Sequence, residues 1–153
     1  MTKPPLLEHL QRLVGRWTTE ATHPAMPGVT VHGTVDVEWL EGERFLIHRA
    51  RTDHGKFPDA IWIIGDASVD RVEGDSAPAP TRLSGHYFDS RGVFRVYEVG
   101  IDAQAWRWWR DAPGFAQRFT GTFADGGNTI IGVSQLSRDN VRWDDDLKIT
   151  YRK

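Results

Sequence analysis

Short stretches of alternating apolar and polar residues, separated by turn residues, run from Gly15 to the end of the chain. The alternation is clearest over residues 30–40, where Val31, Val35 and Val37 fall on one face and polar residues fall on the other. A period of two predicts β-strands with one buried face and one solvent-exposed face. We therefore expect a single all-β domain spanning residues 1–153.

Ten such stretches are separated by clusters of Gly, Pro, Asp, Asn and Ser, which favour turns. The expected strands cover residues 16–23, 30–40, 44–51, 58–66, 82–88, 93–101, 104–110, 116–123, 129–137 and 141–152. Most links are too short for a parallel crossover, so neighbouring strands should be antiparallel. Because closure removes exposed sheet edges, we predict an antiparallel up-and-down β-barrel. Residues 68–81, which are polar and contain proline, are predicted to form a surface loop.

A short amphipathic helix is predicted before the first strand. Five apolar residues at helical spacing end at a glycine, which is typical of a helix C-terminus. These residues are Leu6, Leu7, Leu10, Leu13 and Val14, followed by Gly15. A helix of two to three turns is too short to be stable alone, so its apolar stripe should pack against one end of the barrel.

The composition argues against several classes of function. The chain contains no cysteine, which excludes disulfides and thiolate chemistry. A net charge of −2 gives no basic surface for nucleic acid or for an anionic membrane. The six histidines lack paired spacing, so we expect no metal site. With no apolar run of membrane length and no signal-like segment, the expected location is the cytoplasm.

The entry to the first strand carries a family resemblance. Gly15-Arg16-Trp17, directly after a short helix, resembles the signature of calycins, the group that includes lipocalins, fatty-acid-binding proteins and nitrobindin-like barrels. Calycins also place an arginine of the last strand against this tryptophan, and Arg152 stands at the matching place. The resemblance therefore implies a barrel whose helix end is closed by the helix, Trp17 and Arg152, with a cation over the indole ring.

Further stretches are similar to a family of uncharacterised bacterial calycin-like domains. They are Phe57–Ala60, His86–Gly92, Trp108–Phe115, Arg118–Phe123 and Asp144–Leu147. This resemblance implies the fold and no particular activity. Nitrobindin-like barrels bind haem through a histidine near the C-terminal end, whereas the last histidine here is His86. We therefore expect no haem and no other cofactor.

With one end closed by the helix, a ligand should enter at the opposite end. The aromatic residues predict a cavity for a small apolar or aromatic molecule, and an arginine, Arg110 first, would hold a ligand carboxylate. Arg107 and Arg118 lie near Arg110 across a predicted hairpin. The alternation leaves the inward face of residues 93–101, 104–110 and 129–137 open. The expected ligand-binding residues are His48, Trp62, His86, Tyr97, Trp106, Trp108, Arg110, Phe115 and Phe119.

Two other functions compete with small-molecule binding. His48 and His86 are candidate catalytic residues of a cofactor-free isomerase, cyclase or hydrolase, because imidazole titrates near neutral pH. An enclosed pair of a histidine and a carboxylate would favour this alternative. Alternatively, aromatic side chains fill the barrel, and the protein acts only through its surface, for example as a homodimer. An exposed aromatic sheet face around Trp39 or Trp109 would favour that second alternative.

Overall fold

The computed structural model describes residues 5–68 and 82–153 and shows a closed antiparallel barrel of ten strands in sequential order. The predicted fold class is confirmed. The predicted loop 68–81 lies, apart from Ser68, outside the described residues. The elements are α1 (Pro5–Leu10), η1 (Gln11–Leu13), β1 (Gly15–Thr22), β2 (Val31–Trp39), β3 (Phe45–Thr52), β4 (Ala60–Asp66), β5 (Leu83–Asp89), β6 (Phe94–Ile101), β7 (Ala105–Arg110), β8 (Ala116–Ala124), η2 (Asp125–Gly127), β9 (Thr129–Ser137) and β10 (Asp144–Arg152).

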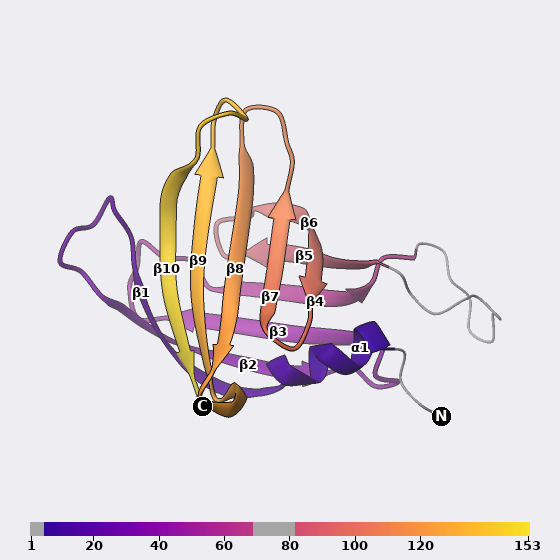
Figure 1. Cartoon of the computed structure of the whole chain (residues 1–153). Coiled ribbons are helices and arrows are strands. Elements are labelled where there is room, and N and C mark those ends of the chain that lie inside the picture. Colours follow the sequence, from indigo (N-terminus) through magenta and orange to yellow (C-terminus); the bar gives the residue numbers. More distant parts are fainter. Residues whose placement is uncertain (1–4, 69–81) are drawn as a thin grey trace.

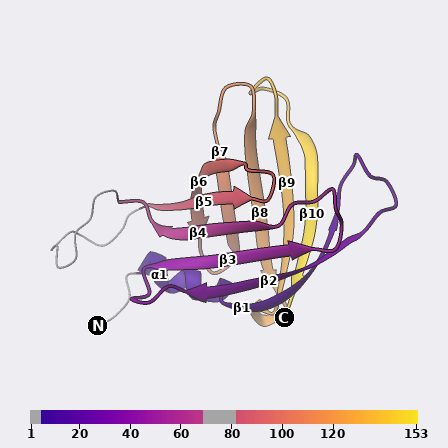
Figure 2. The same ribbon diagram turned by 180° about the vertical axis from the view of Figure 1, so that it is seen from behind.

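The strands form two crossing walls that join into one barrel. β7–β10 stand upright in Figure 1, and β2–β5 cross behind them, as the reverse view in Figure 2 also shows. The ring closes where β1 pairs with β10, with Thr19 opposite Tyr151. Helix α1 lies across the lower end of the barrel in Figure 1. We call this helix end the floor and the opposite end, with the loop between β1 and β2, the mouth.

The last strand begins later than predicted, at Asp144 instead of Val141. The carboxylate of Asp139 accepts hydrogen bonds from the backbone N–H groups of Val141 and Arg142, at 2.9 and 2.7 Å. These groups are therefore satisfied by a local turn and do not pair with β9.

The strand register settles the faces that the alternation left open. Tyr97 on β6, Trp106 on β7 and Ile130 on β9 are buried and face the interior. Val96 and Ile131, next to two of them, are about half exposed on the outer surface. Apolar residues therefore stand on both faces of β6 and β9, which is why their pattern alone could not select the inward face.

The floor is a packed apolar plug. Leu7, Leu10 and Leu13 of the helical segment are buried, and they pack against the same core as Trp17. The Trp17 indole N–H donates to the Leu13 carbonyl at 2.9 Å, so its one polar atom is satisfied within the plug. Trp39, at the end of β2, donates to the side chain of Gln11 at 2.7 Å and ties the helical segment to the barrel. The prediction that the helix closes one end is therefore confirmed.

The cation at the floor is not Arg152. Antiparallel pairing places Arg152 opposite Thr18 on the outer face, where it pairs with Glu20 at 3.5 Å. The next residue, Lys153, instead places its Nζ 4.8 Å from the centre of the Trp17 ring. The expected contact between a cation and the indole ring exists, but the expectation of Arg152 is wrong by one residue, because side chains alternate between faces.

Three glycines allow large aromatic rings to lie against the barrel wall. A Cβ at Gly132 would come 2.6 Å from the Phe119 ring, and one at Gly121 would come 3.0 Å from the same ring. A Cβ at Gly85 would come 3.0 Å from the Trp62 ring. These rings occupy the space that Cβ atoms would fill, so they leave room nearer the barrel axis.

Candidate ligand cavity

Between the floor and the mouth, the barrel encloses a cavity of about 290 Å³. It extends to residues of the mouth loops, including Phe57 and Arg91, as expected for entry opposite the helix. Six of the nine predicted ligand-binding residues line it: His48, Trp62, Tyr97, Trp106, Trp108 and Phe119. The barrel therefore keeps space between the side chains at this level.

The aromatic wall is a continuous set of ring contacts. Trp108 stacks on Phe119 with ring centroids 5.2 Å apart and 8° between the planes. Tyr97 meets the edge of Trp108 at 4.8 Å, and Trp62 lies 5.0 Å from Tyr97. Such rings are stiff and offer flat apolar surface, which suits a planar or apolar guest.

His86 does not line the cavity, so the expectation that it faces the interior is wrong. It pairs with Ile63 and Val96, whereas the inward row runs through Trp62, Tyr87 and Arg95. The His86 ring instead contacts Phe94 on the outer surface, with centroids 6.3 Å apart. Side chains directly opposite in neighbouring strands share a face, so His86 belongs to the outside. Both the ligand-binding and the catalytic roles suggested for it lose their basis.

Arg110 and Phe115 lie at the mouth but outside the cavity lining. The Arg110 guanidinium donates to the carbonyl of Phe115 at 3.3 Å. The guanidinium of Arg95, from β6, lies 5.0 Å from the centre of the Phe115 ring and lines the cavity. Of these two arginines, Arg95 lines the cavity and Arg110 does not.

The expected group of three arginines is not formed. Arg107 and Arg118 pair in register with Thr120 and Trp109 on the outer face of the barrel. The Arg118 guanidinium lies 3.9 Å from the centre of the Trp143 ring, so this arginine is engaged on the outside of the barrel. The odd and even positions of β7 point in opposite directions, so Arg107 and Arg110 cannot share one ligand.

Arg95 is half-buried and forms no ion pair within the described parts of the chain. Its neighbour at the mouth, Arg91, is held by Asp89 at 2.7 Å. Desolvation opposes ionisation of Asp89, but hydrogen bonds from Arg91 and Tyr87 outweigh it and hold the pKa of that carboxyl well below its ordinary value. Asp89 is therefore charged at neutral pH and pairs with Arg91, whereas Arg95 has no carboxylate within ion-pair distance in the described parts of the chain.

The floor side of the cavity is polar but uncharged. His48 is only 4% exposed, and neither of its ring nitrogens has a hydrogen-bond partner among the described residues. Desolvation by burial lowers the pKa of His48 to about 4, so the ring is neutral at pH 7. The Trp106 indole nitrogen also lacks a partner there, and the two rings lie 6.0 Å apart. Burial raises the pKa of the neighbouring Tyr151 hydroxyl, which stays protonated.

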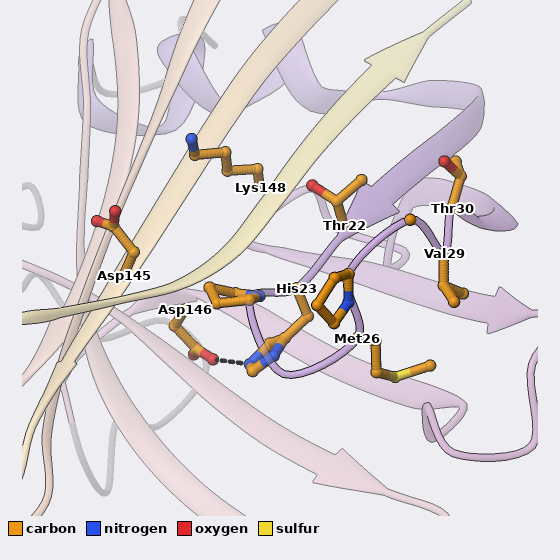
Figure 3. A pocket seen from close by; sticks show the side chains of 11 residues that line it. Thr22, His23, Met26, Val29, Thr30, Asp145, Asp146 and Lys148 are labelled. Atoms are coloured by element: carbon orange, nitrogen blue, oxygen red, sulfur yellow. Dashed lines mark hydrogen bonds and ion pairs between the residues drawn. The ribbon is translucent and has the colours of Figure 1, made fainter.

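A histidine–carboxylate pair stands at the mouth, where the sequence did not predict it. The Nε2 of His23, after β1, lies 2.6 Å from Oδ1 of Asp146 on β10, and Figure 3 shows the two side chains pointing toward each other. Both residues line the interior cavity and also a shallower pocket beside the loop that contains Met26. They therefore form the wall between these two spaces.

Both ring nitrogens of His23 are already hydrogen-bonded within the protein. The backbone N–H of Ala25 donates to the Nδ1 of His23 at 3.0 Å, so Nε2 carries the ring proton and donates it to Asp146. A general base needs an open nitrogen facing its substrate. The geometry thus supports a structural role for His23, closing one side of the mouth.

The sequence did not indicate two kinds of residue that line the cavity. Arg95 and Gln117 stand two residues before Tyr97 and Phe119, so strict alternation along their strands could have found them. Tyr87 stands opposite Trp62 in the neighbouring strand, so only the register identifies it. Asp146 could not be found in this way. A β-bulge between Asp145 and Lys148 shifts the register of β10 and changes the direction of the side chains there.

The outer face carries an apolar patch of Ile61, Phe88, Phe94 and Val96 on β4, β5 and β6. These side chains are between 42% and 57% exposed, and the Phe88 and Phe94 rings lie 4.9 Å apart. Trp39 and Trp109, the two tryptophans considered for such a face, do not belong to this patch. Trp39 is bound to Gln11, and the indole of Trp109 donates to Glu98 at 2.8 Å.

Within residues 5–68 and 82–153, no group of three or more metal-ligating side chains converges. No helix in these ranges is long and apolar enough to cross a bilayer. A comparison with protein-family models finds no matching family, and a comparison with curated proteins finds no relative. The fold and the site thus define a closed ten-stranded antiparallel barrel with an aromatic-lined interior cavity.

Proposed function

We propose that the protein binds a small apolar or aromatic molecule inside the barrel, as calycin-like proteins do. The observation that carries this proposal is the cavity of about 290 Å³ walled by Trp62, Trp108 and Phe119. Apolar ligand surface would be removed from water against rigid rings, at about 25 cal/mol per Å². A bicyclic aromatic compound is small enough for this space and offers two flat faces to the wall.

A carboxylate on such a ligand would lie at the mouth, beside Arg95. This arginine is half-buried, lines the cavity and lacks an ion-pair partner among the described residues. A guanidinium can donate two parallel hydrogen bonds to a carboxylate. A carboxylate at the floor side would instead face His48, a neutral ring, at the cost of its own desolvation.

Titration with naphthalene and 2-naphthoate, followed by the indole N–H signals in ¹H–¹⁵N spectra, tests the proposal. We expect shifts at Trp62 and Trp108 and little change at Trp109 and Trp143, which lie outside the cavity. From the size of these probes, dissociation constants on the order of 100 μM are expected.

A matched pair of variants locates the binding. Ala50→Phe adds a ring on the cavity wall, whereas Ile61→Phe adds it on the outer face. Binding should weaken at least about tenfold in Ala50→Phe and persist in Ile61→Phe. If neither probe moves the wall signals, or if both variants bind equally, interior binding is refuted.

Surface association is the second candidate, favoured by the apolar patch around Phe88 and Phe94. Patches of exposed apolar residues often mark protein contacts. Light scattering at several protein concentrations tests for a homodimer. A dimer that dissociates in Phe94→Lys would support this role, and a monomer at all concentrations would refute it. Catalysis is less favoured, because His48 has no carboxylate partner in the described structure and His23 has no open nitrogen.

A further inference from the structure

At the floor side of the cavity, several buried polar atoms have no hydrogen-bond partner among the described residues. The two ring nitrogens of His48 and the indole nitrogen of Trp106 are buried without a hydrogen-bond partner in the described structure. Both residues line the cavity, and both are more than nine-tenths buried. Buried polar atoms are nearly always hydrogen-bonded in folded proteins, because leaving them unpaired is costly. Three such atoms on two neighbouring side chains indicate a place where another molecule supplies the partners.

The chemistry of these atoms defines what the partner must offer. The indole nitrogen can only donate a hydrogen bond, so it requires an acceptor. A neutral imidazole has one donor nitrogen and one acceptor nitrogen, so it also requires a donor. Burial keeps His48 neutral, as the lowered pKa of about 4 shows. A ligand group that both accepts and donates would supply a partner to the Trp106 indole nitrogen and to one ring nitrogen of His48.

We propose that the cavity binds a phenolic ligand, with its hydroxyl group inward between His48 and Trp106. This inference rests on the proposed function and names the class of ligand for that cavity. The ligand hydroxyl accepts a hydrogen bond from the Trp106 indole and donates one to the acceptor nitrogen of His48. The two rings are neighbours in the lining, with centroids 6.0 Å apart, which is the proximity that one shared hydroxyl requires.

Other polar groups fit this subsite less well. A carbonyl or an ether accepts hydrogen bonds but donates none, so it can pair with His48 only through the ring N–H, whereas a hydroxyl pairs with either ring nitrogen. A carboxylate would bring a charge next to two neutral side chains, His48 and Tyr151. The aromatic body of a phenol continues naturally along Trp108 and Phe119, which stack on each other and line the same cavity.

Three probes of nearly the same shape test the inference: 2-naphthol, 2-methoxynaphthalene and naphthalene. We expect 2-naphthol to bind at least about fivefold more tightly than either of the others, because only its hydroxyl both donates and accepts. The Trp106 indole N–H signal should move downfield with 2-naphthol and not with naphthalene. The ratio of the 2-naphthol affinity to the naphthalene affinity should fall to about one in Trp106→Phe and in His48→Leu.

The control variant is Trp109→Phe, which removes an indole N–H outside the cavity and should retain the preference. If all three probes bind but 2-naphthol gains less than about fivefold, the phenolic subsite is refuted and interior binding stands. If none of the three binds, both proposals fail. Should a cavity variant not fold, the preference and the Trp106 signal in the unaltered protein still decide the question.

Discussion

The floor and the upper part of the barrel are built from the same residue types but packed differently. At the floor, Trp17 is 1% exposed, and its indole N–H is bonded to the chain beside it. Above it, Trp106 is almost as buried, yet its indole N–H has no partner within the described residues. The floor is a closely packed core, whereas the barrel above it keeps a cavity and buried polar atoms that have no hydrogen-bond partner in the described structure. One barrel thus combines a closely packed end with an end that keeps space, and the packed end should contribute more to stability.

The largest expected effect comes from truncating the floor. Trp17→Ala should destabilise the protein by about 3–5 kcal/mol, because it removes a buried ring from close packing. Trp108→Ala removes the same type of side chain from a half-buried position in the cavity wall. Because this position already borders empty space, the loss of unfolding free energy should be clearly smaller than for Trp17→Ala. Urea unfolding at pH 7 measures both. Equal losses in the two variants would show that the floor and the cavity wall do not differ in packing.

The next largest expected effect is the pH dependence of stability that the buried His48 causes. Its pKa is about 4 in the folded state, whereas the ordinary value for a histidine is 6.5, so the unfolded chain binds the proton more readily. Stability should therefore be unaffected above pH 6.5, fall as the pH drops from 6.5 to 4, and lose about 3 kcal/mol through this group.

The matched variant for the pH experiment is His48→Leu, which cannot titrate. At pH 7 it should be at least as stable as the unaltered protein, since it replaces an unpaired polar ring with an apolar side chain. Its unfolding free energy should fall less between pH 6.5 and 4. Parallel pH profiles for the two proteins would mean that His48 is not held neutral by burial.

The smallest effect concerns the cation over Trp17. Lys153→Ala should cost up to about 1 kcal/mol, because it removes the ammonium group from the indole face. Arg152→Ala removes only a solvent-exposed ion pair with Glu20 and should change stability by less than about 0.5 kcal/mol. Thermal unfolding of both variants compares them. A larger loss for Arg152→Ala would contradict the assignment of Lys153.

Much of the candidate site follows from alternation, and its failures have physical causes. His48, Trp62 and Trp108 line the cavity as predicted. His86 was expected to face the interior, and its pairing with Val96 places it on the outer face instead. Asp146 was missed because a bulge breaks the period of two. Arg110 donates to the Phe115 carbonyl in the loop after β7, a contact that no local pattern encodes.

The sequence by itself determined the ten strands, their antiparallel order and the helix at one end, because these depend on short-range periodicity and turn chemistry. Only the tertiary structure decided that the interior is hollow and that His48 and Trp106 stand there without partners among the described residues. A cavity depends on how glycines and rings from different strands fit around one axis. That fit is a property of the closed barrel, and it exists in no single strand.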